Sequence, residues 1–474
     1  MPLVAGVDSS TQATKVVVVD TDDGRVVARG RAAHTVTGRD GARESDPASW
    51  WDALATARAA TGRGDAVAAI AVGAQQHGLV VLDDAGDPLR PAKLWNDTQS
   101  AAQATALVEH FGASWWAEQV GVVPVPSITA TKWAWLREHE PEVAARAATV
   151  CLPHDFLNLR LTGRAVTDRG DASGTGWWSS HHEGLESAVL EHLGLDPAQV
   201  PEVVVGGPAG EVTSAAAERR GIPAGIPVGP GSGDNAAAAM GLGLRSGDAA
   251  MSLGTSGTVF AVGDRPVVDP SGVVAGFADA TDRHLPLACT LNCTLAVDRI
   301  AELLGLDREA VEVGGDAVVL PYLDGERTPN LPHARGSIVG LTHETTAGEI
   351  LWGAYLGASH ALLVAVDRIA ELTGAVDEGT PLWLVGGGAA GTAWRRAIAT
   401  LSGRPLRIPP PDEWVALGAA AQAASLVEGG SPYDHARRWA PPAEEIDPIT
   451  PDPALGERFA AVAGDLEALN RREW

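Results

Sequence analysis

The sequence predicts an α/β protein of two related domains that face each other across a cleft. With 474 residues, the chain exceeds the roughly 250–300 residues that one hydrophobic core supports. Short β-branched segments alternate with helical patterns. Each half also opens with two apolar segments around a polar hairpin, near Asp8 and near Gly254. This repeat predicts two similar domains, over residues 1–244 and 245–474.

The first half predicts a sheet with helices. The expected elements are strands at residues 3–7, 15–20, 25–31 and 67–73, helices after Asp46 and at 127–139, and a strand, a turn and a short helix over 144–168. The last of the four strands runs into Gln75-Gln76-His77-Gly78. Open α/β sheets place their ligands at the carboxyl ends of strands, so this tetrapeptide is a candidate for a binding site.

The second half repeats the pattern after a turn-rich stretch, residues 223–233, that leads into Asp234-Asn235. The expected elements are a small-residue helix at 236–243, strands at 249–253, 258–262, 317–320 and 382–385, and helices at 349–372, 415–426 and 453–471. Two glycine turns lie between these elements, Gly254-Thr255-Ser256-Gly257 and Gly386-Gly387-Gly388. Glycines at such turns let a ligand approach the backbone closely.

Composition and charge exclude several classes of protein. The chain has 60 Asp and Glu against 35 Lys and Arg, a formal charge of −25, which repels nucleic acids and anionic membranes. Its three cysteines give neither a disulfide framework nor a zinc spacing. No long apolar run and no leader pattern is evident. We therefore expect a cytoplasmic protein that does not bind nucleic acid or membranes.

Three turns have the residues of a phosphate or metal site. Asp8, at a strand end before the hydroxyls of Ser9, Ser10 and Thr11, could hold a hydrated magnesium ion beside phosphate oxygens. Gly254-Thr255-Ser256-Gly257 offers backbone and hydroxyl donors to phosphate, and Gly386-Gly387-Gly388 offers bare backbone to a flat ligand such as adenine. Each is also compatible with an ordinary turn.

Three further side chains are candidates for chemistry. Asp234, in a loop exposed by glycines, could accept a hydroxyl proton, or it could cap the helix that follows. His77 could donate to a substrate hydroxyl, or it could be a satisfied histidine at a strand end. Asp97 could be a cap or a sugar ligand.

Taken together, these segments resemble the FGGY family of carbohydrate kinases, on the actin/hexokinase-like (ribonuclease H-like) fold. The resemblance covers about residues 3 to 440. The segments that carry it include Gln75-Gln76-His77-Gly78, Leu94-Trp95-Asn96-Asp97, residues 127–139, Asp171-Ala172-Ser173-Gly174-Thr175, Gly233-Asp234-Asn235-Ala236, residues 252–257, residues 320–329 and Gly386-Gly387-Gly388-Ala389.

The resemblance implies transfer of the ATP γ-phosphoryl group to the terminal hydroxyl of a ketopentose, with D-xylulose as first choice. It implies that Asp234 is the catalytic base and that Asp8 positions Mg²⁺. The implied sugar ligands are Gln76, His77, Asp97, Asp234 and Asn235. The implied nucleotide ligands are Ser10, Thr11, Lys15, Gly254, Thr255, Ser256, Gly386, Gly387 and Gly388. The first domain would then hold the sugar and the second mainly the nucleotide.

Several positions depart from the family pattern. Ser9-Ser10 stands where a glycine-containing hairpin is common, Gln76 where many relatives have Met, and Ala390-Gly391 where Arg-Ser is common. Because Gln76 adjoins the implied sugar site, ribulose, another pentulose or a polyol remains an alternative substrate. An actin-like ATPase without sugar kinase activity is a more remote alternative, which the polar sugar ligands disfavour. The sequence leaves the oligomeric state open, a homodimer included.

Overall fold

Two α/β units make up the chain in the computed structural model, which describes residues 2–331 and 333–470. Unit 1 consists of Met1–Arg245, Asp264–Leu285 and Asp412–Ala440, and unit 2 of Ser246–Gly263, Pro286–Pro411 and Pro441–Trp474. The first change of unit, after Arg245, lies one residue from the expected division. Two later segments nevertheless return to unit 1, which the single division of the sequence did not anticipate.

The central sheet of unit 1 has the strand order β13-β14-β5-β1-β2-β3, with β15 paired to β5. The bounds are β1 (Leu3–Ser9), β2 (Ala13–Asp20), β3 (Val26–Ala33), β5 (Val67–Ala74), β13 (Gly210–Glu211), β14 (Pro227–Val228) and β15 (Ser232–Gly233). β1 is antiparallel to β2 and parallel to β5. β1 and β5 therefore end at the same edge of the sheet, and β15, also parallel to β5, ends beside them.

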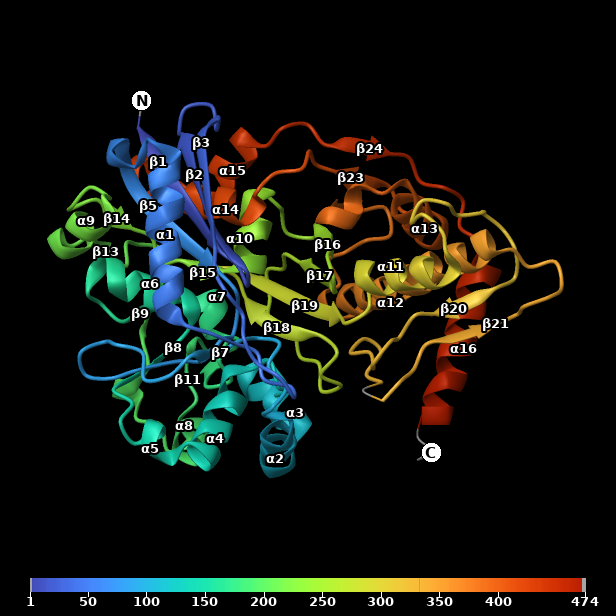
Figure 1. Ribbon diagram of the computed structural model, residues 1–474, viewed down its shortest axis with the longest axis horizontal. Coiled ribbons are helices and arrows are strands. Elements are labelled where there is room, and N and C mark those ends of the chain that lie inside the picture. The colour runs from blue at the N-terminus through green and yellow to red at the C-terminus, as the bar shows by residue number, and fades with distance from the viewer. Residues whose placement is uncertain (1, 332, 471–474) are drawn as a thin grey trace. The chain divides into compact units, whose positions relative to one another are not determined.

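Helices cover both faces of this sheet (Figure 1). Alternate residues of β1 and β2 point to opposite faces, because side chains in a strand have a period of two. Val7 and Val16 pack with Trp50 and Leu54 of α1 (Pro47–Thr61), whereas Val4 and Val17 pack against α14 (Trp414–Glu428). The helix expected after Asp46 is α1; Asp46 caps it and Pro47 occupies its first turn.

The small-residue helix α14 belongs to unit 1, although it lies in the second half of the sequence. It touches β1 so closely that a Cβ on Gly6 would lie 1.9 Å from the carbonyl oxygen of Ala416. A Cβ on Gly241 of α10 (Asp234–Gly241) would lie 2.1 Å from the carbonyl oxygen of Trp414. Alanine and glycine are needed here because larger side chains would separate the helix from the sheet.

The other elements of unit 1 surround this core. The helices are α2 (Ala101–Phe111), α3 (Ala113–Trp115), α4 (Thr129–His139), α5 (Pro141–Ala144), α6 (Pro153–Thr162), α7 (Arg169–Ala172), α8 (Ser187–Leu193), α9 (Ser214–Arg220) and α15 (Pro432–Trp439). The short strands are β4 (Glu44–Ser45), β6 (Val80–Leu82), β7 (Ala92–Lys93), β8 (Thr149–Cys151), β9 (Val166–Asp168), β10 (Trp178–Ser179), β11 (Gly184–Leu185), β12 (Glu202–Val204) and β18 (Ala275–Ala278).

Unit 2 contains a second sheet, in which strands follow the order β19-β17-β16-β22-β23-β24. Its strands are β16 (Ala249–Leu253), β17 (Gly257–Ala261), β19 (His284–Thr290), β22 (Leu382–Val385), β23 (Leu406–Ile408) and β24 (Glu444–Ile446); β20 (Val318–Leu320) pairs with β21 (Ser337–Val339). Its helices are α11 (Thr294–Leu304), α12 (Ala347–Thr373), α13 (Thr392–Ser402) and α16 (Pro453–Asn470). As in unit 1, an antiparallel pair, β16-β17, continues into a parallel neighbour, β22.

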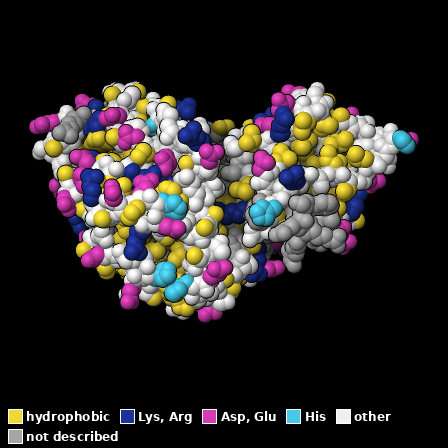
Figure 2. Space-filling model, turned by 60° about the horizontal axis from the view of Figure 1, so that its bottom comes forward, with side chains coloured by type: hydrophobic (Ala, Val, Ile, Leu, Met, Phe, Trp, Pro, Cys, Tyr) yellow, Lys and Arg dark blue, Asp and Glu magenta, His cyan; other side chains and the backbone are white. Residues whose placement is uncertain are grey.

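Helix α12 is long and apolar enough to cross a membrane, although no such segment was expected from the sequence. In the structure, 78% of its apolar window is buried inside the protein, and core helices pass the same test. Among the described residues, Cys151, Cys289 and Cys293 form no disulfide bond. On the face drawn in Figure 2, acidic and basic side chains are intermixed, without a continuous basic patch.

Most predicted elements are present, with shifted ends. The clearest difference concerns Asp234, which was expected in a loop before a helix at 236–243 and is instead the first residue of α10. Gly233 is the residue that precedes the helix, and its extended backbone ends β15, so strand and helix follow each other without a loop. The last helix was expected to reach Arg471, which lies outside the described residues.

Candidate active site

Four polar candidates of unit 1 lie at the edge where β1, β5 and β15 end. Asp8 is next to last in β1 and is paired with Gly73 of β5. Gln76 and His77 follow β5, and Asp234 follows Gly233 of β15, which pairs with Ala74. Parallel pairing therefore brings together residues that are more than 200 positions apart in the sequence, as expected for an open α/β sheet.

Asp8 is buried and has one oxygen without a partner. Its Oδ2 lies 3.1 Å from Nζ of Lys15, while Oδ1 has no hydrogen-bond partner. Burial raises the pKa of Asp8, against the opposing effect of Lys15. A buried free carboxylate oxygen suits a hard cation, and Mg²⁺ usually keeps several of its own waters. Within residues 2–331 and 333–470, no group of three or more His, Cys, Asp or Glu side chains could form a metal site, so Asp8 fits a hydrated ion rather than a protein cage.

Lys15, expected to contact phosphate, lies between two carboxylates. Its Nζ is 2.6 Å from Oε2 of Glu413 as well as 3.1 Å from Asp8. Glu413 immediately precedes α14, so this contact depends on the return of the C-terminal segment to unit 1. The ammonium is thereby fixed beside Asp8, and a phosphate would have to compete with Glu413 for it.

The first hairpin is stabilised mainly by its own hydrogen bonds. Both N and Oγ of Ser10 donate to the carbonyl oxygen of Ala13, at 3.0 and 2.9 Å. Oγ1 of Thr11 accepts a hydrogen bond from Nε1 of Trp95 at 3.2 Å. These contacts set the hairpin without the glycine that is common in the family.

His77 is held in an unusual backbone conformation. Its φ is 60°, in the left-handed region that non-glycine residues rarely adopt. Its carbonyl oxygen accepts hydrogen bonds from Oγ1 of Thr129 and Nζ of Lys132, both at 3.2 Å. Its ring packs at a tilt on Phe277, and Nδ1 lies 3.2 Å from Oδ1 of Asp171. Such strain persists only where several contacts fix the residue, and it often marks a functional position.

Gln76, Asn235 and Asp234 form a hydrogen-bonded chain. Nδ2 of Asn235 donates to Oε1 of Gln76 at 2.6 Å and to Oδ1 of Asp234 at 2.9 Å. The amide oxygen of Gln76 is therefore engaged, which leaves its NH₂ group for a ligand. A Cβ on Gly233 would lie 2.4 Å from Cγ of Gln76, so a glycine is required for this arrangement.

Asp234 has the properties of a base. Enclosure by the protein raises its pKa to about 7, and the negative charges of Asp8 and Asp171 add to this effect. The side chain is only partly buried by surface area, so it remains accessible. A carboxylate with a raised pKa accepts a proton more readily than an ordinary one, and a pKa near the working pH suits general-base catalysis.

Asp97 is fully buried, and both of its oxygens accept hydrogen bonds from protein groups. Oδ2 accepts from Nζ of Lys93 at 3.2 Å and from the backbone N of Arg43 at 2.9 Å, and Oδ1 accepts from the backbone N of Gln99 at 3.1 Å. Of the two interpretations of Asp97, these contacts favour the structural one.

In unit 2, the glycine hairpin joins β16 to β17. Leu253 pairs with Gly257 across it, so Gly254, Thr255 and Ser256 form the turn. Both N and Oγ1 of Thr294, at the start of α11, donate to the carbonyl oxygen of Gly254, at 3.1 and 2.8 Å. The turn is thereby anchored, while Thr255 is exposed and Ser256 is half-buried.

The three glycines after β22 lie at the same sheet edge, since Val385 pairs with Ser252 of β16. Gly386 has φ 85°, and a Cβ on it would lie 2.8 Å from the carbonyl oxygen of Leu253. A Cβ on Gly388 would lie 2.8 Å from the side chains of Leu253 and Thr294. By contrast, a Cβ on Gly387 would meet nothing within 4 Å. Two of the glycines therefore serve packing, and the middle one leaves open backbone for a flat ligand.

Sequence reasoning missed three charged residues that shape these sites. Asp171 lies against His77, and Glu326 accepts hydrogen bonds from the backbone N of Leu291 and Asn292 in the loop before α11. Both lie in segments that carried the family resemblance, which was the available signal. Glu413 lies 398 residues from its partner Lys15, and nothing local in the sequence indicates that contact.

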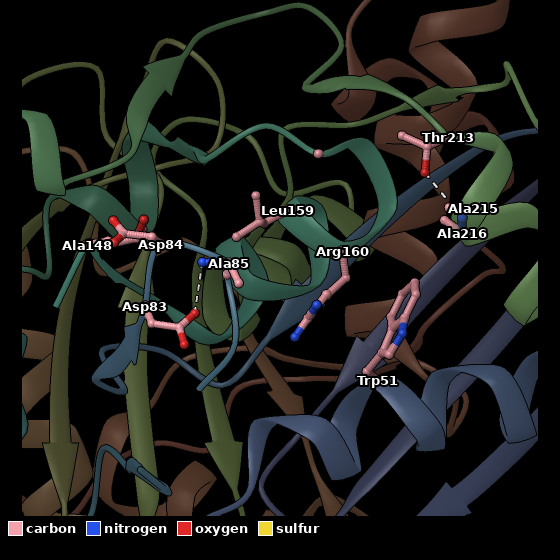
Figure 3. A pocket seen from close by; sticks show the side chains of 13 residues that line it. Trp51, Asp83, Asp84, Ala85, Ala148, Leu159, Arg160, Thr213, Ala215 and Ala216 are labelled. Atoms are coloured by element: carbon pink, nitrogen blue, oxygen red, sulfur yellow. Dashed lines mark hydrogen bonds between the residues drawn. The ribbon is translucent and has the colours of Figure 1, made fainter. Parts of the chain in front are cut away.

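A large surface pocket of unit 1 lies away from these residues. Its volume is about 470 Å³, and it is lined by residues of α1, α6 and α9 and by the turn that contains Asp83 (Figure 3). Arg160 in its wall pairs with Asp87 at 2.7 Å, and Asp83 accepts a hydrogen bond from the backbone N of Ala85. The pocket contains none of the predicted site residues.

Comparison with known proteins identifies the family. Residues 3–241 match the N-terminal domain of the FGGY family of carbohydrate kinases, and residues 249–427 match its C-terminal domain. The chain is 55% identical to the xylulose kinase of Streptomyces coelicolor, over 100% of this chain and 98% of the relative. It is 54% identical to the xylulose kinase of Streptomyces rubiginosus, over 99% and 98%.

Solved structures agree with this assignment. The crystal structure of xylulose kinase from Bifidobacterium adolescentis is 36% identical and superposes with a TM-score of 0.87, covering 98% of this chain and 99% of that one. Xylulose kinase from Rhodospirillum rubrum is 26% identical with a TM-score of 0.90, covering 99% and 100%. The predicted fold class and family are thus confirmed, and the chain belongs to the FGGY family of carbohydrate kinases.

Proposed function

We propose that this protein transfers the γ-phosphoryl group of ATP to the terminal hydroxyl of D-xylulose, giving D-xylulose 5-phosphate. Similarity to xylulose kinases over the full length of the chain supports this substrate. One observation supports the chemistry most directly: Asp234 and Asp8 lie at the same sheet edge, beside polar side chains suited to a sugar, and the pKa of Asp234 is raised.

In this proposal, unit 1 binds the sugar. Gln76, His77 and Asn235 exchange hydrogen bonds with its hydroxyls. Asp234 accepts the proton of the attacking hydroxyl as the new bond to the γ-phosphorus forms, while the bond from that phosphorus to its bridging oxygen breaks and ADP leaves. Asn235 orients the Asp234 carboxylate through the 2.9 Å hydrogen bond. Because phosphoryl transfer depends mainly on alignment and charge neutralisation, fixing the sugar against the base is the principal task of these residues.

Unit 2 would bind the nucleotide. The turn of Gly254, Thr255 and Ser256 would donate to phosphate oxygens, and the open backbone at Gly387 would face the adenine. Asp8 of unit 1 would hold hydrated Mg²⁺, which when bound neutralises charge on the phosphates. We further propose that the enzyme works in the cytoplasm, in line with its similarity to xylulose kinases.

A panel of sugars with ATP and Mg²⁺ tests the proposal. ADP release stimulated by D-xylulose, with kcat/KM at least ten times that for ribulose, other pentuloses or polyols, supports it. A preference for another sugar would keep the kinase and replace the substrate. ATP hydrolysis that no sugar stimulates would instead favour an ATPase.

A further inference from the structure

The contact of His77 with Asp171 joins two parts of the chain that are 94 residues apart. His77 follows β5, and Asp171 lies in the short helix α7. Oδ1 of Asp171 lies 3.2 Å from Nδ1 of His77 and also accepts a 3.4 Å hydrogen bond from its backbone N. The Asp171 side chain is fully buried, and that of His77 is 8% exposed. One carboxylate oxygen thus faces both the ring and the backbone of His77.

The other oxygen of Asp171 is tied to a second histidine. Oδ2 accepts a hydrogen bond of 3.1 Å from Nδ1 of His154, which is itself fully buried and lies 3.0 Å from Asp155 on its other side. Burial opposes a charge on His154, but the surrounding carboxylates raise its pKa to about 9. Burial likewise opposes a charge on Asp171, but its contacts with His154 and His77 lower its pKa to about 2. Asp171 is therefore ionised, and its contact with His154 fixes the position of the carboxylate.

The ring of His77 has little freedom to turn away from this carboxylate. A Cβ on Gly174 would lie 1.8 Å from Cε1 of His77, so the ring occupies the space that any side chain there would need. Phe277 lies on it at 4.8 Å between ring centroids. The backbone N of Gly174 donates to the carbonyl oxygen of Asp171 at 3.0 Å. The same turn therefore contains the carboxylate of Asp171 and the glycine that leaves room for the His77 ring.

We propose that Asp171 is a positioning residue for sugar phosphorylation, which acts through His77. A carboxylate oxygen 3.2 Å from Nδ1 favours the imidazole tautomer that carries its hydrogen on that nitrogen, which leaves Nε2 to face a sugar hydroxyl. The inference rests on the proposed function, because it takes His77 to be a sugar ligand. Asp171 makes no contact with substrate in this scheme, and its effect should pass entirely through the histidine.

A double-mutant cycle tests this route. The variants are Asp171→Asn, His77→Asn and the pair, with asparagine chosen at position 77 because it tolerates a positive φ. Asp171→Asn should raise the KM for the sugar about ten-fold, the upper end of the range for one lost hydrogen bond between neutral groups, and leave the KM for ATP unchanged. In the His77→Asn background the same change should raise the sugar KM little further. Asp87→Asn, the same carboxyl-to-amide change at a surface ion pair with Arg160 in unit 1, is the matched control and should leave the sugar KM unchanged.

Gly174→Ala provides a second test, which leaves the charges of Asp171 and His154 in place. It should displace the ring of His77 from Asp171 and raise the sugar KM selectively, whether or not Asp171→Asn folds. An unchanged sugar KM in either folded variant, or an equal effect of Asp171→Asn with and without His77, would overturn the inference. Failure of the wild-type enzyme to phosphorylate any sugar would instead overturn the proposed function.

Discussion

Replacement of Asp234 by asparagine would remove the proposed base while keeping the size and polarity of the side chain. The amide can still contact Asn235, so the sugar ligands should stay in place. The raised pKa also predicts a stable variant. An aspartate whose pKa is about 7 in the folded protein, against about 3.9 unfolded, costs the folded state stability as pH rises between those values. Asparagine carries no such penalty, so the Tm of Asp234→Asn at pH 8 should equal or exceed that of the wild type.

The expected loss of turnover follows from the role of the carboxylate. General-base catalysis contributes about 10²–10⁴-fold, so kcat should fall by about that factor while the KM for sugar and ATP changes little. In the wild type, the ionised fraction of a group with a pKa of about 7 is about one half at pH 7, one tenth at pH 6 and one hundredth at pH 5. The kcat/KM of the wild type should accordingly fall about five-fold from pH 7 to pH 6 and about fifty-fold from pH 7 to pH 5.

A coupled assay of ADP release, run from pH 5 to pH 8 with saturating Mg²⁺, measures both effects. Sugar binding to Asp234→Asn, followed by tryptophan fluorescence or calorimetry, separates lost chemistry from lost binding. Near-native turnover of the folded variant would mean that the base lies elsewhere. A wild-type profile that is flat down to pH 5 would refute the raised pKa.

Three further predictions follow from the geometry. Chelation of divalent cations should abolish turnover, because the free oxygen of Asp8 is placed to hold Mg²⁺, and undiminished phosphorylation in excess chelator would refute that role. His77→Asn should raise the KM for sugar about ten-fold and leave the KM for ATP unchanged, since one hydrogen bond to the sugar is lost; equal changes in both constants would point to a general disturbance of the fold. Gln76→Met should free Asn235 from its 2.6 Å hydrogen bond and alter the kcat/KM ratio between xylulose, ribulose and polyols. An unaltered ranking of the sugars would show that Gln76 does not set specificity.

Local patterns predicted most elements of the two sheets, because the alternation of residues in strands and the residues typical of turns can be recognised within short stretches of sequence. The strand at 382–385 and the helix after Asp46 are confirmed. The ends of other elements shifted by a few residues. The Asp234 boundary shifted because β15 passes directly into α10, a junction set by pairing with β5 rather than by local turn residues.

Contacts between distant segments decided the rest of the site. The pairing of Lys15 with Glu413 and the packing of α14 on β1 depend on a segment that crosses back into unit 1 near the end of the chain. Asp171 likewise reaches His77 across 94 residues. Neither periodicity nor composition predicts such contacts, because they form only when the chain folds.

The sequence by itself determined the fold class, the family and the chemical types of the candidate groups, since these follow from motifs of a few residues each. Only the tertiary structure decided their environments. Asp234 is an ordinary carboxylate in the sequence, and it acquires a pKa of about 7 from enclosure by the protein and from the charges of Asp8 and Asp171. Desolvation and charge coupling depend on distances in space, which residues far apart along the chain acquire only on folding.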